Sequence, residues 1–200
     1  VNYRWAPEWP FPAGLDDAMA VLRWMREAGG EIGGDPSRIL VGGDSAGGNL
    51  AAALPIRARE ERISIVAAAL LCPVTDFHFE KFPSFERLAP AGVVIDAPFM
   101  AFARAAYLTT QQQWLHPWAS PALGDLKDYP PTLLISGGAD PLVDENRAFA
   151  ENLAAAGVKV DHLIADAMPH GFYFFPGLLN ETDAAFTAIG KFLPESLRRL

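Results

Sequence analysis

Short apolar runs alternate with helical patterns along this chain, and the alternation restricts the fold more than any other feature. Four strand-like runs, bounded by Gly, Pro and polar residues, cover Arg38–Gly42, Ile65–Leu71, Thr132–Ser136 and Val158–Ile164. Three of them are apolar at successive positions, as in strands that are buried on both faces. Such alternation favours a parallel sheet with helices on both faces, so the predicted fold class is α/β.

Helical spacing fills the segments between these runs. Apolar residues recur three and four positions apart behind Asp16 and Asp17, which predicts a helix start there. Further helices are predicted at Ala46–Arg59, Glu145–Ala156 and Thr182–Phe192. Because a proline inside a helix costs about 3 kcal/mol, we expect the helix that contains Pro55 to kink or to end early, near Leu54.

The segment Thr75–Trp118 is a long aromatic insertion between two predicted strands. It contains nine Phe, Tyr and Trp residues together with several prolines. Two interpretations remain open: the aromatic side chains add to the core, or they form an apolar cap over a site. We predict one domain over residues 1–200, with a cap-like insertion at about 75–118.

Composition excludes several classes of function. The 16 Lys and Arg against 24 Asp and Glu give a net charge of −8 without any basic run, which argues against nucleic-acid binding and against docking on anionic membranes. The longest apolar stretch, Ile65–Cys72, is too short to span a bilayer. Cys72 is the only cysteine, so we expect a buried thiol without a disulfide or a cysteine zinc cluster. No secretory signal pattern is present, and a cytoplasmic location is expected.

A candidate nucleophile follows the first predicted strand. Gly43–Gly47 reads Gly-Asp-Ser-Ala-Gly and leads directly into a helix of small residues, which is the strand–turn–helix setting of a nucleophile elbow. In such a turn the serine takes a strained backbone conformation, and glycines on both sides avoid Cβ clashes. We therefore predict Ser45 as the nucleophile and the backbone N–H of Ala46 as an oxyanion donor.

A serine nucleophile needs a base, and the base needs an acid that fixes its tautomer. Of the four histidines, His170 is the predicted base, since it follows the last predicted strand in a loop at its carboxyl end. The other three are His78, His116 and His162, of which the first two lie in the aromatic insertion and the third within a strand. Asp140 follows Thr132–Ser136 and is the predicted acid. Asp144 is the main alternative, although it is better placed as a helix N-cap, and Asp166 is a weaker one.

Several motifs in the same order resemble the hormone-sensitive-lipase-like branch of the α/β-hydrolase fold, a family of bacterial carboxylesterases. They are Tyr3–Glu8 (Tyr-Arg-Trp-Ala-Pro-Glu, where the family has Leu in place of Trp), Gly33–Pro36, Gly43–Asn49, Asp140–Glu145 and His170–Phe172. The resemblance implies a Ser-His-Asp hydrolase of short- to medium-chain esters, with neither metal nor organic cofactor. It also implies that the aromatic insertion and Phe172–Phe175 shape the substrate pockets, with Phe77 and Phe172 as substrate-binding residues. Asp44 is interpreted as a structural residue that binds neighbouring loops.

One departure from the family concerns the oxyanion hole. Family members carry His-Gly-Gly-Gly ahead of the Tyr-Arg-Leu-Ala-Pro-Glu motif, and these 200 residues contain no such motif. Because Val1 is not Met and Val1–Arg4 reads as the end of a strand, we expect that N-terminal strands are missing and that Arg38–Gly42 has an open edge. Two alternatives to an active esterase stay open: a catalytically impaired fragment or interaction module, and a hydrolase of amides, thioesters or lactones. A homodimer is also left open.

Overall fold

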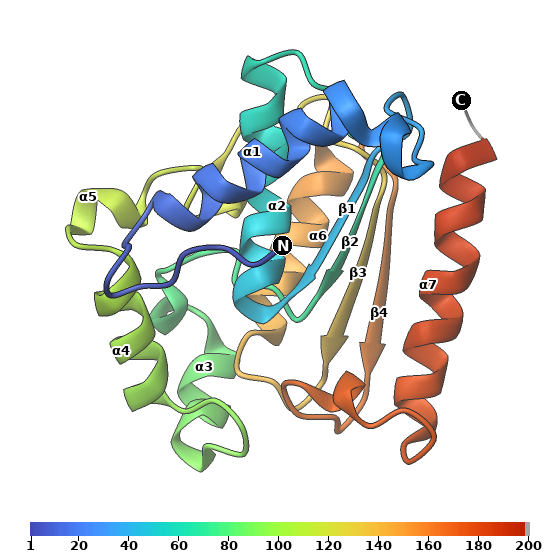
Figure 1. The fold of residues 1–200 in the computed structure, drawn as a ribbon. Helices are drawn as coiled ribbons and strands as arrows, with labels where there is room; N and C mark the ends of the chain where they lie inside the picture. The colour runs from blue at the N-terminus through green and yellow to red at the C-terminus, as the bar shows by residue number, and fades with distance from the viewer. Residues whose placement is uncertain (199–200) are drawn as a thin grey trace.

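Four parallel strands form the central sheet of the protein, in the order β1-β2-β3-β4 (Figure 1). The computed structural model describes residues 1–198. The strands are β1 Leu40–Asp44, β2 Ala67–Leu71, β3 Thr132–Gly137 and β4 Val160–Ala165. Each lies within two residues of a predicted run, and the α/β fold class is confirmed. All neighbours pair in parallel, so the carboxyl ends of the strands lie at one edge of the sheet.

Helices cover both faces of this sheet, as the alternation of patterns predicts. The α-helices are α1 Ala13–Ala28, α2 Ser45–Glu60, α3 Pro83–Leu88, α4 Ala97–Tyr107, α5 Gln111–Trp114, α6 Val143–Ala155 and α7 Asn180–Arg198. One core joins α2 and α6 to β2 and β3 through side chains such as Ile56, Leu134 and Phe149. A second core packs α7 on the opposite face through Ala185 and Phe192. Among residues 1–198, no helix is both long and apolar enough to cross a membrane.

Helix α2 runs from Ser45 to Glu60, which agrees with the predicted Ala46–Arg59. Of the two effects expected at Pro55, the early end near Leu54 is wrong, because the helix continues through Pro55. Nearly every residue from Gly48 to Ala58 is buried, and this packing against the sheet and α1 outweighs the backbone cost of one proline. Helix α1 begins at Ala13, before the predicted start at Asp16 and Asp17, whose carboxylates instead bind Arg57 and Arg4.

Strand β1 is an edge strand in the described part of the chain. It pairs with β2 on one side, and no strand of residues 1–198 pairs with its other side. The expected strand end at Val1–Arg4 is wrong, because these residues are irregular. No strand among the described residues forms the backbone hydrogen bonds of a sheet with them. The Arg4 backbone N–H donates instead to the Asp17 carboxylate, and its guanidinium forms a two-pronged ion pair with the same carboxylate.

The aromatic insertion contains α3, α4 and α5, which lie to one side of the sheet in Figure 1, with α3 at the level of the carboxyl ends of the strands. Its own core is formed by Phe77, Phe79, Phe85 and Met100, which are all buried. Phe99 and Phe102 of α4 remain 52% and 65% exposed. The insertion therefore adds core packing and also presents aromatic side chains at the surface, and both of the open interpretations keep their support.

Candidate active site

The turn between β1 and α2 presents Ser45 at the carboxyl end of the sheet. Ser45 is the first residue of α2 and has a φ of +51°, in the left-handed region that a residue with a Cβ rarely adopts. A Cβ atom at Gly43 would overlap the Gly47 carbonyl, so the chain requires glycine there. Strain at Ser45 and close backbone approach at Gly43 are the features of a nucleophile elbow.

The two glycines of this motif are not equivalent. A Cβ atom at Gly47 would meet no described atom within 4 Å. The expectation that both glycines avoid a clash is therefore wrong for Gly47, because its Cα hydrogens face open space on the first turn of α2.

Backbone contacts hold together the loops that follow β3 and β4. Ala139 N–H donates to Met168 O at 2.9 Å, and Gly138 N–H donates to Ala165 O at 2.8 Å. A Cβ atom at Gly137 would collide with the Met168 carbonyl, so glycine permits this approach. The first loop carries Asp140 and the second carries His170, and their closeness follows from this pairing of backbones.

Three predicted residues meet here. The His170 Nε2 atom is 2.8 Å from the Ser45 Oγ atom, and the His170 Nδ1 atom is 2.8 Å from Asp140 Oδ2. An ionised carboxylate only accepts hydrogen bonds, so the ring proton lies on Nδ1 and Nε2 is free to accept from the serine hydroxyl. Asp140 is fully buried and His170 is 6% exposed, which shields the pair from water.

Asp140 is also fixed by its own backbone neighbourhood. Its Oδ1 atom accepts a hydrogen bond from Leu142 N–H at 2.9 Å, so each carboxylate oxygen has its own donor. The interpretation of Asp144 as N-cap is wrong, because Leu142 occupies the N-cap position and Asp144 lies inside the first turn of α6. The Asp144 carboxylate instead accepts from Ser84 N–H and pairs with Arg147.

The first turn of α2 leaves backbone donors beside Ser45. The first N–H groups of a helix have no partner within the helix, and the side chain of the N-cap residue, Asp44, accepts none of them. Ala46 lies in this turn, with its N–H next to Ser45 and at the positive end of the helix dipole. Asp44 itself is exposed, and its carboxylate interacts with the hydroxyl of Tyr173 in the loop after β4, where burial and this carboxylate both raise the pKa of Tyr173.

The other histidines have different surroundings. His78 and His116 lie in the aromatic insertion, where their nitrogens contact Asp76 and the Trp118 backbone N–H. The Nε2 atom of His162 is 2.9 Å from Ser136 Oγ in the neighbouring strand, and partial burial lowers the pKa of His162 to about 4. None of the three lies within hydrogen-bond distance of Ser45 among the described contacts.

Two further buried titratable groups, Cys72 and Glu145, lie beside the site, and the burial of Cys72 confirms the expected buried thiol. The Cys72 Sγ atom and ligand atoms of Asp140 and His170 lie within 4.8 Å of one another. Both nitrogens of His170 already have partners, and burial raises the pKa of the Cys72 thiol, so this cluster favours a protonated thiol rather than a metal ligand set. Burial also raises the pKa of Glu145, whose Oε1 atom accepts from Thr75 N–H.

A cavity of about 340 Å³ lies between Ser45 and the aromatic insertion and is lined mainly by apolar side chains. Its walls include Phe77, Met100 and Tyr107 from the insertion. The structure thus brings Phe77 to the cavity, but it does not bring Phe172 there. Phe172 is 1% exposed and packs in the core beneath α7, where its ring supports the His170 loop.

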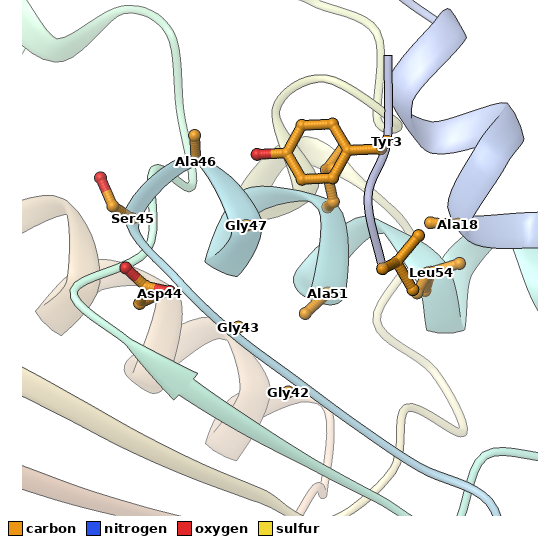
Figure 2. A pocket seen from close by; sticks show the side chains of 12 residues that line it. Tyr3, Ala18, Gly42, Gly43, Asp44, Ser45, Ala46, Gly47, Ala51 and Leu54 are labelled. Carbon is orange, nitrogen blue, oxygen red and sulfur yellow. The ribbon is translucent and has the colours of Figure 1, made fainter. Parts of the chain in front are cut away.

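A second cavity, of about 410 Å³, lies along the outer edge of β1 (Figure 2). Figure 2 shows Gly42 and Gly43 along one side of it and the Tyr3 ring on the other side, near Ala46. Tyr3, Ser45 and Ala46 line both cavities. Ser45 therefore lies where two cavities meet.

Comparison with known proteins agrees with this geometry. A family model described as the alpha/beta hydrolase fold matches residues 1–174. The chain belongs to the α/β-hydrolase family. The predicted resemblance is therefore confirmed, and several of the relatives that match are named esterases or carboxylesterases.

Carboxylesterase NlhH of Mycobacterium tuberculosis is 39% identical over the whole chain, and Esterase LipI of the same species is 36% identical over 90% of it. The solved structure of a hyperthermophilic esterase from the archaeon Pyrobaculum calidifontis superposes with a TM-score of 0.90, at 34% identity over 96% of the chain. The chain spans 63% of the length of NlhH, 56% of LipI and 64% of the archaeal structure.

Proposed function

We propose that this α/β-hydrolase is a carboxylesterase that acts on short- to medium-chain esters through Ser45, His170 and Asp140. One observation carries the proposal: the unbroken series of two 2.8 Å contacts from Ser45 Oγ through the imidazole to a buried carboxylate. Esterase and carboxylesterase relatives support it.

The reaction has two halves. As Ser45 Oγ attacks the ester carbonyl carbon, its proton passes to His170 Nε2 and the carbonyl electron pair moves onto oxygen. The bond to the alcohol oxygen then breaks, and the alcohol leaves with the proton from Nε2. Water attacks the acyl-enzyme with the same histidine as base, and the acid is released. Asp140 stabilises the imidazolium in both halves.

The developing oxyanion accepts a hydrogen bond from Ala46 N–H and is stabilised by the positive end of the α2 dipole. Because loss of one oxyanion donor typically lowers kcat by about 100- to 1000-fold, and no His-Gly-Gly-Gly motif occurs in the sequence, we expect slow turnover by the 200-residue chain. This keeps the impaired fragment as the second candidate, supported by the same missing motif.

The test combines covalent labelling with turnover. The purified chain and its Ser45→Ala variant are incubated with a fluorophosphonate and analysed by intact mass, and release of p-nitrophenol from the acetate and butyrate esters is followed in parallel. We expect one phosphonyl adduct and measurable turnover for the wild type and neither for Ser45→Ala. Equal labelling or turnover by the variant would contradict the role of Ser45. Labelling without turnover would favour the impaired fragment.

Matched amide, thioester and lactone substrates in the same assay test the other bonds that this chemistry could cleave. The mechanism requires no metal or organic cofactor.

We also propose a homodimer and a cytoplasmic location. The outer edge of β1 supports the dimer, because a strand edge without a partner strand pairs readily with another chain. Light scattering of the purified chain tests the dimer. Cell fractionation tests the location.

A further inference from the structure

One polar group in the 340 Å³ cavity lacks a partner. The Tyr107 hydroxyl is buried and makes no hydrogen bond to any of residues 1–198 that the structure describes. Buried polar groups are nearly always paired with protein, water or a ligand. The unpaired hydroxyl of Tyr107 is an exception that needs an explanation. Tyr107 lines the cavity that extends to Ser45.

Tyr107 is held rigidly. It ends α4, and its carbonyl oxygen accepts a hydrogen bond from Phe11 N–H at 2.8 Å. Its ring packs against Phe11 and Phe77, each with ring centroids 5.7 Å away. A ring fixed on both sides cannot turn its hydroxyl out to solvent, so an occupant of the cavity is the available partner.

Most of the lining is apolar, as at Leu50, Ile95 and Met100. Of the other polar side chains in the lining, Arg4 pairs with Asp17, and the Asn49 amide donates to two backbone carbonyls. Burial raises the pKa of Tyr107 above its usual value, so the phenol stays protonated and donates. A buried donor without a partner in a mainly apolar cavity recognises an acceptor at one place on an otherwise apolar ligand.

We propose that Tyr107 is a specificity-determining residue whose hydroxyl donates to an ether or keto oxygen in the substrate chain that fills this cavity. The preferred substrate class is therefore an ester with a second acceptor oxygen on its acyl or alcohol chain. This inference rests on the proposed esterase function and narrows it.

The test uses two isosteric pairs in which one CH₂ is replaced by oxygen. On the acyl side, p-nitrophenyl 3-methoxypropanoate is compared with the pentanoate. On the alcohol side, 2-methoxyethyl acetate is compared with butyl acetate, with acid release followed by pH-stat. For each pair, the ratio of kcat/KM for the ether over the hydrocarbon is measured in wild type and in Tyr107→Phe.

We expect Tyr107→Phe to lower this ratio by about two- to tenfold in one pair, the effect of one neutral hydrogen bond. Because the ratio cancels any effect of the substitution that both esters of a pair share, it reports the ether oxygen alone. Tyr173→Phe is the matched control. It removes another buried tyrosine hydroxyl, but Tyr173 does not line this cavity, so its ratios should equal those of wild type.

Equal ratios in wild type and Tyr107→Phe for both pairs would overturn the inference alone, because hydrolysis of the hydrocarbon esters would still support the esterase. A wild-type chain that hydrolyses none of the four esters would overturn the proposed function and this inference with it. A drop of the same size in Tyr173→Phe would also overturn the inference, since the effect would then not depend on the cavity.

Discussion

Replacement of Gly43 by alanine should destabilise the protein, whereas the same change at Gly47 should not. A Cβ atom at position 43 would lie 2.3 Å from the Gly47 carbonyl oxygen, 2.5 Å from its carbon and 2.9 Å from Gly48 N. Real Cβ atoms essentially never come closer than 3.0 Å, so the oxygen contact must lengthen by at least 0.7 Å, from 2.3 to 3.0 Å. All three obstacles are backbone atoms, and none can rotate away.

The first turn of α2 has little room to give way. Pro73 packs closely against this turn, since a Cβ atom at Gly48 would lie only 3.0 Å from Pro73 Cα. We therefore expect Gly43→Ala to cost about 3 kcal/mol, the upper part of the range for overpacking. Gly47→Ala meets open space and should be neutral or stabilising by up to about 1 kcal/mol, because alanine favours helix.

Urea unfolding followed by the fluorescence of the five tryptophans measures both variants against wild type. The comparison requires equal m-values, so that the midpoint reports the free energy of unfolding. Fluorophosphonate labelling adds a second readout, since displacement of the turn should slow the reaction of Ser45 in Gly43→Ala only. A Gly43→Ala protein as stable as Gly47→Ala would refute the steric argument for the elbow.

Two further predictions concern Asp140 and His162. Asp140→Asn should lower kcat by about 10,000-fold, because the NH₂ group of the asparagine faces Nδ1 of His170 and imposes the wrong tautomer. Little stability should be lost, since the amide oxygen still accepts a hydrogen bond from Leu142 N–H. Ester hydrolysis and urea unfolding check these two effects, and a decrease in kcat of less than tenfold would contradict the prediction. The pKa of His162 is depressed to about 4 in the folded protein, so the unfolded state binds more protons between pH 6.5 and 4 and stability falls as pH falls through this range. Urea midpoints of His162→Gln should fall less over the same pH range than those of wild type, and parallel curves would exclude His162 as the cause.

The sequence indicated which candidate residues would lie together where their positions depend on local order. Ser45 follows a strand and precedes a helix, and Asp140 and His170 each follow a strand, so parallel topology alone brings all three to one edge of the sheet. Local rules failed where packing decides. Helix α2 continues through Pro55 because the residues around Pro55 are buried. Phe172 follows His170 closely in the sequence, but it packs in the core.

The sequence by itself determined the α/β class, the strained turn at Ser45 and the order of the three residues, because strand and helix patterns, glycines and loop positions act over short stretches of chain. Only the tertiary structure decided which side chains line the cavity and which polar groups lose their partners. Tyr107 lies 62 residues after Ser45 in the sequence, and nothing near it in the chain indicates that both line one cavity. Burial, cavities and unpaired hydroxyls arise from contacts between distant segments, which short-range patterns do not encode.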